Sequence, residues 1–394
     1  MLSAVLIQLI LAAPLAVFPQ HVWSQLGPGN NCAYDVPGEC IQETQRISVP
    51  GLLEKTVTLG DGIVYYIKSD GGRVYVCQNS SCSSDCAELP FTFVNTINAS
   101  EGFEVGDSVV FFFVVNDSSG SGPTLAYYAA RYYPHSGALD CRFLAPAPGA
   151  FMTVVHRPGV SACFDIWGFA APWSTQSEIT RVDISGHSVE SLGAVDGHLS
   201  TCFSTVSPSL CVAWQPGERN DSDSLIIYGL PTLNLIDTLH FEDIQGNVIL
   251  LEDALFVPAS DVLWEIPVGS AHRARVVVSL SGRLASNIVL RDANVYYLAQ
   301  IGDDTCLVSD DGRNRVTWPL GKTSGRRTLF LTETLAGVLD RDSLLFVDLS
   351  TGQESLRVSM PYTTMFDEIT RSILVHDSVI CAVAEDRILI LSCH

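Results

Sequence analysis

Lysine is scarce in this chain of 394 residues, and positive charge is scarce as a whole. Lysine occurs only as Lys55, Lys68 and Lys322, and Lys plus Arg total 22 against 43 Asp plus Glu, for a formal net charge of −21. Nucleic acids, heparin-like polyanions and anionic lipid surfaces are bound through patches of Lys and Arg, so the composition speaks against them as partners. The acidic residues are spread along the chain rather than gathered in a block. We interpret most of them as a solvated surface, with a basic partner as the alternative.

Long apolar runs are lacking beyond the first two dozen residues. A mostly apolar run from Ala4 to Phe18, followed by the small-residue site Val22-Trp23-Ser24, predicts a signal peptide at residues 1–24. An uncleaved signal anchor is the alternative, although the run is short and contains Pro14. No later segment is long and apolar enough to span a bilayer, so we expect a secreted, extracellular protein without a membrane span after cleavage.

Catalytic and metal-binding motifs are absent from the sequence. It contains no Gly-x-Ser-x-Gly elbow, no P-loop and no His-Glu-x-x-His. Cys77, Cys82 and Cys86 are closely spaced but have no histidine nearby, which favours disulfides over a zinc site. Residues 220–223 and 303–304 are rich in oxygen ligands that suit calcium, but they do not fit the EF-hand spacing, and solvated turns are the favoured interpretation. We predict no catalytic residue, no cofactor and no metal site.

Cysteine is plentiful by comparison. Twelve cysteines, an even number, fit a secreted protein in which the thiols are paired. The candidate disulfide-forming residues are Cys32, Cys40, Cys77, Cys86, Cys141, Cys163, Cys202, Cys211, Cys381 and Cys393. Four Asn-x-Ser sequons in turn-rich sequence predict N-glycosylation, with Asn79, Asn98, Asn116 and Asn220 as the candidates.

Helical patterns are few, and no stretch of about 12 residues or more keeps apolar residues at helical spacing. Short runs of β-branched and aromatic residues dominate, with Gly, Asp, Asn or Pro between them. The expected strands are 62–68, 74–77, 109–115, 225–228, 248–256, 262–266, 275–280, 295–299, 344–347 and 388–391. This pattern predicts an all-β fold.

The second half of the chain has a regular rhythm. An acidic turn leads an apolar strand at Asp223, Asp261, Asp303, Asp342 and Asp386, at intervals of 38, 42, 39 and 44 residues. A period of about 40–45 residues is the size of one four-stranded propeller blade, as in WD40-like repeats. We therefore predict a β-propeller, with seven blades as the first expectation and eight as the alternative.

The predicted organisation has one folded domain. A signal peptide at 1–24 precedes a Cys-containing lead at 25–50, and the propeller occupies 51–394. Two β-sandwiches are the alternative, but a linker with a shift in composition would be expected between them. The only Gly/Ser-rich stretch, 118–122, is interpreted as a hairpin loop.

The most distinctive local pattern is Val-Gly-Asp-Ser-Val-Val-Phe-Phe-Phe at residues 105–113. The seven apolar residues from Val109 to Val115 predict a strand buried on both faces. Together with Cys77, Cys86 and Cys141 at their spacings, the pattern resembles the sema domain of semaphorins and plexins over roughly residues 60–145. The resemblance implies a Cys77–Cys86 disulfide. Tyr132-Tyr133 stands where sema domains carry another cysteine, so Cys141 would pair elsewhere, with Cys82 as a candidate.

The sema resemblance implies a receptor–ligand module rather than an enzyme. Sema propellers bind plexins or one another, commonly as dimers. The chain is therefore expected to act as a secreted ligand or decoy for a plexin-like cell-surface receptor, and the resemblance implies a homodimer. No binding residue carries over, because the matched segments are structural core.

A sialidase-like glycoside hydrolase on a propeller scaffold is the alternative function. Ser309-Asp310-Asp311-Gly312, followed by Trp318, is similar to the Asp-box turn of sialidases, but Asp311 and Gly312 are adjacent here, whereas one residue separates them in that family. A type I′ hairpin is therefore the favoured interpretation. Sialidases also need three arginines around a carboxylate.

One aromatic cluster has the composition of a binding hot spot. Tyr127-Tyr128 and Tyr132-Tyr133 surround Arg131. Tyrosines on a blade strand are expected to be half-buried in any case, so a structural role is the favoured interpretation.

Overall fold

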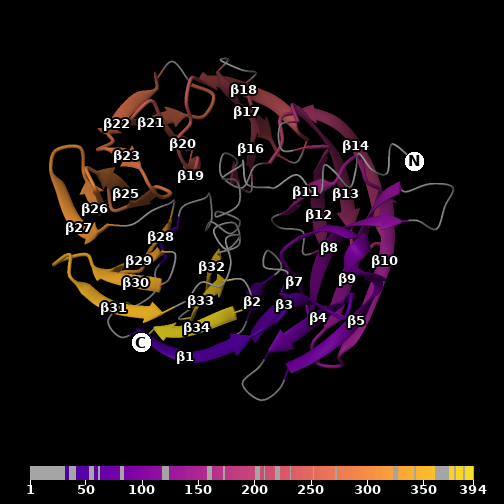
Figure 1. Cartoon of the computed structure of the whole chain (residues 1–394). Coiled ribbons are helices and arrows are strands. Elements are labelled where there is room, and N and C mark those ends of the chain that lie inside the picture. The colour runs from indigo at the N-terminus through magenta and orange to yellow at the C-terminus, as the bar shows by residue number, and fades with distance from the viewer. Residues whose placement is uncertain are drawn as a thin grey trace, which may run out of the picture.

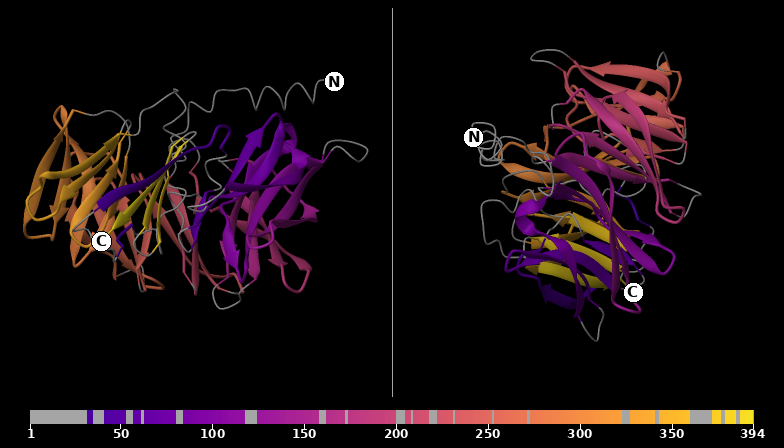
Figure 2. Two further views of the ribbon diagram at one scale, coloured as in Figure 1. Left: turned by 90° about the horizontal axis from the view of Figure 1, so that it is seen from below. Right: turned by 90° about the vertical axis from the view of Figure 1, so that its right-hand side faces the viewer.

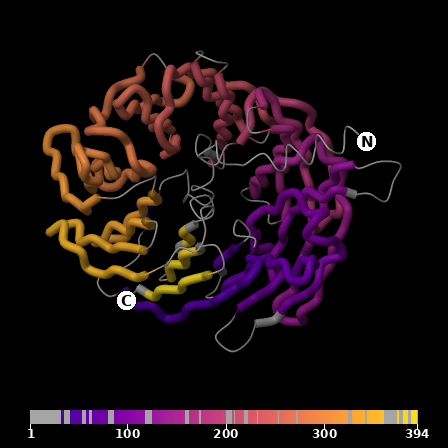
Figure 3. The backbone as a smooth tube through the Cα atoms, viewed as in Figure 1, coloured from indigo at the N-terminus to yellow at the C-terminus, as the bar shows by residue number. Residues whose placement is uncertain are grey.

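Eight small antiparallel sheets follow one another around a central axis in the computed structural model, seen along that axis in Figure 1 and as a tube in Figure 3. Each sheet is one blade of a β-propeller, and Figure 2 shows the blades standing side by side around the ring. The structure describes residues 32–393 except 35–40, 53–56, 61–62, 80–83, 118–123, 158–161, 172–173, 200–204, 208, 218–221, 231, 252, 271–272, 323–326, 341–342, 360–371, 377–378 and 385–386. The all-β propeller expected from the sequence is confirmed.

The first four blades are built from the following strands, from the axis outward. Blade 1 contains β2 (Thr58–Gly60), β3 (Ile63–Asp70), β4 (Arg73–Asn79) and β5 (Ser84–Thr92), and a 3₁₀ turn, η3 (Phe93–Asn95), follows it. Blade 2 contains β6 (Thr96–Ala99) and β7 (Phe103–Val105) as a divided inner strand, then β8 (Ser108–Asp117), β9 (Thr124–Tyr133) and β10 (Ala138–Pro146). Blade 3 contains β11 (Phe151–His156), β12 (Cys163–Phe169), β13 (Gln176–Asp183) and β14 (Ser188–Asp196). Blade 4 contains β15 (Thr205–Val206), β16 (Leu210–Gln215), β17 (Asp223–Gly229) and β18 (Asn234–Phe241).

The remaining blades follow the same order. Blade 5 contains β19 (Ile249–Leu251), β20 (Ala254–Ala259), β21 (Val262–Pro267) and β22 (Arg275–Ser279). Blade 6 contains β23 (Arg283–Leu284) and β24 (Val289–Arg291) on the inside, then β25 (Asn294–Ile301), β26 (Asp304–Asp310) and β27 (Arg315–Gly321). Blade 7 contains β28 (Thr328–Leu331), β29 (Leu335–Leu339), β30 (Ser343–Asp348) and β31 (Glu354–Ser359). Blade 8 contains β32 (Ser372–His376), β33 (Val379–Ala384), β34 (Arg387–Cys393) and β1 (Ile41–Ser48).

The two ends of the chain close the ring together. β1 pairs antiparallel with β34 and forms the outermost strand of blade 8, so indigo and yellow strands lie side by side in Figure 1. The propeller therefore begins earlier than residue 51, and the expected N-terminal lead at 25–50 contains one of its strands. Closing the last sheet with a strand from the first part of the chain leaves no gap in the ring.

The repeat seen in the sequence corresponds to the third strand of each blade. β17, β21, β26, β30 and β34 each begin at, or just after, one of the five leading aspartates. The third strands of blades 1, 2 and 3 begin farther apart, at Arg73, Thr124 and Gln176. The first expectation of seven blades is wrong, and the number is eight. The longer repeats in the first half hide the period there.

β8 is the strand predicted to be buried on both faces, and it is. Every residue from Val109 to Val115 is at most 4% exposed. Its odd-numbered side chains pack against blade 1 with Phe91, and its even-numbered side chains pack against blade 3 with Phe164. The hydrophobic core of the molecule is distributed in this way between successive blades.

The other expected strands are also present, with one exception. The run 248–256 is two antiparallel strands, β19 and β20, rather than one, because the chain turns between Leu251 and Ala254. The hairpin loop expected at 118–122 lies outside the described residues, but β8 and β9 on either side of it pair as a hairpin. The predicted signal peptide also lies outside them. No helix in the described ranges is long and apolar enough to cross a membrane.

Buried asparagines connect neighbouring blades near the axis. Asn247 accepts a hydrogen bond from the Ile288 N–H and donates one to the Ile288 carbonyl, and Asn287 does the same with Leu329. Both side chains are at most 1% exposed. Each side-chain amide takes the place of a missing backbone partner, which satisfies buried polar groups that would otherwise destabilise the inner edge of a blade.

Candidate functional site

The outer strands of blade 2 present two different surfaces. β9 and β10 are paired directly, with Arg131 opposite Asp140 and Ala129 opposite Arg142. Side chains alternate along a strand, so one set faces blade 3 and the other faces blade 1. The set that faces blade 3 is polar at its outer end, and the set that faces blade 1 is aromatic.

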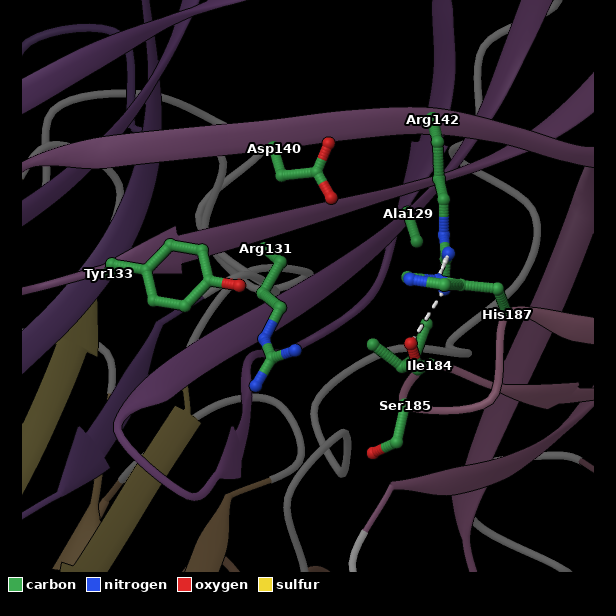
Figure 4. Close-up of a pocket in the computed structure, with 8 residues that line it drawn as sticks. All are labelled: Ala129, Arg131, Tyr133, Asp140, Arg142, Ile184, Ser185 and His187. Atoms are coloured by element: carbon green, nitrogen blue, oxygen red, sulfur yellow. Dashed lines mark hydrogen bonds between the residues drawn. The ribbon is translucent and has the colours of Figure 1, made fainter.

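A cavity of about 250 Å³ lies on the side that faces blade 3, where β9 and β10 meet the turn between β13 and β14. β9 contributes Ala129, Arg131 and Tyr133, and β10 contributes Asp140 and Arg142. The turn contributes Ile184, Ser185 and His187. Figure 4 shows the two arginines extending from neighbouring strands. The lining of the pocket therefore includes two guanidinium groups, an imidazole, two hydroxyls and one carboxylate.

Arg131 is held in place from two sides. Its Nε donates a hydrogen bond of 2.7 Å to Oγ of Ser108, which is itself buried. Its guanidinium carbon lies 5.1 Å from the centre of the Tyr133 ring, a cation–π contact. These two contacts use Nε and one face of the group, and Nη1 and Nη2 of Arg131 make no hydrogen bond to any described residue.

Arg142 reaches across to blade 3. Its Nη2 donates to the Ile184 carbonyl at 3.0 Å, and its Nη1 donates to Nδ1 of His187. Within the described chain, neither Arg131 nor Arg142 has a carboxylate oxygen within 4 Å, whereas Arg181, for example, forms an ion pair with Asp165 at 2.8 Å.

His187 is held in an unusual backbone conformation. Its φ is 57°, the left-handed region, which costs a non-glycine residue about 1–2 kcal/mol. Asp183 fixes the start of this turn, because its Oδ1 accepts a 2.8 Å hydrogen bond from the Gly186 N–H. Backbone strain of this kind gathers at functional sites, and here it places the imidazole against Arg142.

The side of blade 2 that faces blade 1 carries a chain of aromatic rings from the core to the surface. Phe113 contacts Phe91 at 5.0 Å between ring centres, Phe91 contacts Tyr128 at 5.9 Å, and Tyr128 contacts Phe143 at 5.8 Å. Phe143 is 53% exposed. An aromatic side chain is therefore offered to solvent on the same strand as Arg142.

The aromatic cluster singled out in the sequence is divided by the fold. Tyr127 and Tyr132 are fully buried, in agreement with the structural interpretation. Tyr128 and Tyr133 are half-buried, and Tyr133 lines the pocket with Arg131. Sequence reasoning missed Arg142 and His187, which come from a different strand and a different blade. The available signal was that Asp140 and Arg142 alternate along β10 and so lie on the same side as Arg131 and Ala129, their partners on β9.

The cysteines give a mixed outcome. Cys77 and Cys86 are directly opposite on β4 and β5 and form a disulfide, the pairing that the sema resemblance implies. The candidates Cys40, Cys202 and Cys393, and the additional Cys82, have side chains outside the described residues.

Several other candidates are not paired. Cys141, Cys163, Cys211 and Cys381 carry free thiols, against expectation, and so does Cys306. They lie on strands of five different blades. Burial raises the pKa of the Cys141 thiol to about 12, and the neighbouring Asp140 carboxylate adds to the shift. Burial likewise raises the pKa of Cys381 to about 12, so these thiols stay protonated and are poor nucleophiles. Cys32 is buried beside β28, where the backbone of Ala33 forms a bridge to Leu331.

The sequons fall in partly buried positions. Asn79 is 9% exposed, and its Nδ2, the atom that a glycan needs, is buried without a hydrogen-bond partner in the described structure. Asn98 and Asn116 are half-buried, and Nδ2 of Asn98 donates to the Ala150 carbonyl of blade 3. Asn220 lies outside the described residues. Asn79 is therefore a poor acceptor in the folded chain.

The Asp-box-like segment forms a structural turn. Asp310 is buried and pairs with Arg315 at 2.7 Å, and Asp311 accepts backbone hydrogen bonds from Arg313 and Asn314, which lower its pKa. The loop is not the expected type I′ hairpin, because four residues separate Asp310 from Arg315 and only Gly312 among them has a positive φ.

The pocket in blade 2 brings together two arginines and not the three of a sialidase clamp. In the described ranges, no group of three or more His, Cys, Asp or Glu side chains is arranged to hold a metal ion. Asp303, one of the calcium candidates, instead lies 3.3 Å from Nζ of Lys322.

Comparison with known proteins identifies the fold and no family. No family model matches the chain, and no curated protein matches its sequence. Sqt1 of Saccharomyces cerevisiae superposes with a TM-score of 0.56 at 11% identity, over 92% of this chain and 100% of that one. The computationally designed Ika8 protein gives 0.55 at 12% identity (92% and 99%), and BamB from Moraxella catarrhalis gives 0.54 at 10% identity (90% and 100%). At these identities the likeness shows the propeller fold alone.

Proposed function

We propose that this chain is a secreted protein-binding module, a sema-like ligand or decoy for a cell-surface receptor, and that it is not an enzyme. The observation that carries the proposal is the outer surface of blade 2. There, the outermost strand β10 carries Phe143 on the side that faces blade 1 and Arg142 on the side that faces blade 3, with Tyr128 and Arg131 of β9 on the same two sides. Aromatic residues and arginine are the types enriched at the centres of protein interfaces.

The location of this surface supports the sema-like reading. The segments that resemble a sema domain, residues 60–145, build blades 1 and 2, and the Cys77–Cys86 disulfide joins the outer strands of blade 1. The candidate surface is thus carried by the two blades in which the resemblance lies. β10 and β5 are adjacent outer strands at this point.

The test of this proposal compares two double variants, one on the candidate surface and one on the outer strand of another blade as a control. β10 presents Arg142 and Phe143, and β22 in blade 5 presents Arg275 and Val276, of which Val276 is 47% exposed. The secreted protein would be assayed for binding to a panel of receptor ectodomains, plexins included. We expect Arg142→Ala/Phe143→Ala to weaken binding at least tenfold and Arg275→Ala/Val276→Ala to leave it within about twofold.

Three results would overturn the proposal. They are equal loss of binding in both double variants, failure to bind any receptor in the panel, and hydrolysis of a sialoside or another glycoside by the wild-type protein. The last result would instead establish the glycosidase alternative. Light scattering on the same preparations tests the expected homodimer.

A further inference from the structure

The pocket between blades 2 and 3 carries a net positive charge, although the protein as a whole is acidic. The chain carries a net charge of −21, yet the pocket contains Arg131 and Arg142 with a single acid, Asp140. Histidine is counted as neutral in that net charge, and on the same count His187 adds no charge to the pocket. The side chains that line the cavity therefore sum to one positive charge.

Unused hydrogen-bond donors accompany this charge. Nη1 and Nη2 of Arg131 have no partner among the described residues, and neither has Nε of Arg142. The hydroxyl-bearing Ser185 lies at the edge of the same cavity and is exposed. Both arginines line the same cavity, so an oxyanion bound there would have charged donors available from two neighbouring strands.

Both arginines are fixed before any ligand arrives. Ser108 and the Tyr133 ring hold Arg131, and the Ile184 carbonyl holds Arg142. A preorganised guanidinium loses little side-chain entropy on binding, so more of the interaction is available as affinity. The strained turn at His187 also contributes to this preorganisation, since it fixes the part of the cavity lining that comes from blade 3.

We propose that this pocket binds a carboxylate group, the chemistry that matches a single residual positive charge. A carboxylate carries one negative charge, whereas inorganic phosphate and sulfate carry up to two and would leave the site negative beside Asp140. The carboxylate can be that of a glutamate or aspartate on a protein partner or that of a sugar acid. Only the identity of the carrier rests on the proposed function. Binding of the free group does not.

The experiment titrates small anions into the secreted protein at low ionic strength and follows the ring signals of its histidines by NMR. The probes are acetate, a blocked glutamate (N-acetylglutamate N-methylamide), glucuronate and inorganic sulfate. A His187→Gln variant assigns the His187 signal. We expect the signal to shift with acetate at a Kd on the order of millimolar, and the effect to weaken with added salt.

Variants then separate the pocket from general charge effects. Arg131→Ala and Arg142→Ala are each expected to weaken acetate binding about tenfold or more, while Arg275→Ala, on the outer strand of blade 5, leaves it unchanged. Asp140→Asn removes one negative charge from the pocket and is expected to strengthen the binding of sulfate more than that of acetate. Circular dichroism on each variant excludes unfolding as the cause of a loss.

The outcomes decide the inference in both directions. Binding of the blocked glutamate alone identifies a protein carrier, and binding of glucuronate alone identifies a sugar carrier. Either supports a carboxylate site, whether or not a receptor is found. A His187 signal that responds to no carboxylate, equal binding in the Arg131 and Arg275 variants, or tighter binding of sulfate than of acetate by the wild type would overturn it.

Discussion

The two sides of blade 2 are made by the same strands and end differently. Near the middle of the blade both are dry and aromatic, with Phe111 and Phe113 against blade 1 and Phe112 against blade 3. At the rim, one side continues as aromatic rings to Phe143, and the other opens into a pocket held by Arg131 and Arg142. The difference teaches that blade packing specifies only the inner part of each interface and leaves the outer part free to acquire a function.

The largest loss of stability is expected from the buried inner part of blade 2, where its two sides are alike. Phe111→Ala and Phe112→Ala each remove a fully buried ring, one from each interface, and should each lower the free energy of unfolding by about 3–5 kcal/mol. Denaturant unfolding of the purified protein measures this, with Val94→Ala, at an 81% exposed position, as the control. A loss of stability in only one of the two variants would show that the interfaces of blade 2 with blade 1 and with blade 3 do not contribute equally.

The interface between blades 3 and 4 contains a buried titratable group, His198, which is expected to make stability depend on pH. His198 packs between Phe169 and Trp214, and burial lowers its pKa from 6.5 to about 4, although its Nδ1 donates to the Ser174 carbonyl. The unfolded chain therefore takes up this proton below pH 6.5, and the folded chain does not until pH 4. Stability should be full above pH 6.5 and fall by about 3 kcal/mol as the pH drops to 4.

The measurement compares the free energy of unfolding of the wild type and His198→Gln across that range. The variant is expected to be less stable at pH 7 and to lose less on acidification, so that the gap between the two proteins narrows. A gap that stays constant from pH 7 to pH 4.5 would contradict the assignment.

A smaller effect is expected from a tight contact on the side facing blade 3. A Cβ at Gly168 would lie 1.8 Å from the Tyr127 hydroxyl, which is buried without a hydrogen-bond partner in the described structure. Gly168→Ala should cost about 1–3 kcal/mol, whereas Tyr127→Phe should be neutral or stabilising. In the double variant the missing hydroxyl makes room for the new methyl group, so the cost of Gly168→Ala should shrink. Strict additivity in this cycle would mean that Tyr127 is not what restricts Gly168.

The smallest effects on stability are expected at the outer ends of the two sides of blade 2, and they should differ between the aromatic side and the pocket side. Phe143→Ala removes a ring that contacts Tyr128, and should lower stability by about 1 kcal/mol regardless of salt. Arg142→Ala removes polar contacts at a half-exposed position, and should change stability by no more than about 0.5 kcal/mol. Thermal unfolding at low and high salt distinguishes them. A large loss for Arg142→Ala would assign the pocket a structural role.

The parts of the structure that the sequence predicted are those set by local pattern. β8 was recognised because seven consecutive apolar residues leave no polar face, and the blades of the second half because a turn aspartate recurs at each third strand. The blade number was missed since the first three repeats are longer, and because β1 is contributed by the region expected to be a lead.

The sequence pointed to only one of the pocket's basic residues, and the reason differs from that for the blade number. Arg131 was noted among its tyrosines, but Arg142 lies on the next strand, and His187 lies in a turn of the following blade. Their meeting depends on how two blades pack and on a left-handed residue at the tip of a hairpin. Neither is encoded by a motif of contiguous residues.

The pairing of β1 with β34 has a consequence for how the protein is made. Oγ1 of Thr44 donates to the Ile390 carbonyl at 3.1 Å, across 346 residues of sequence. During synthesis, the first strand of the ring must wait unpaired until the last one has emerged, and closing so large a loop is slow. A rearranged gene that places residues 41–48 after residue 393, with a short turn between because Ile41 and Cys393 are directly opposite, would make the eighth blade contiguous. Such a chain is expected to reach the closed ring faster and to expose a lone strand edge for less time.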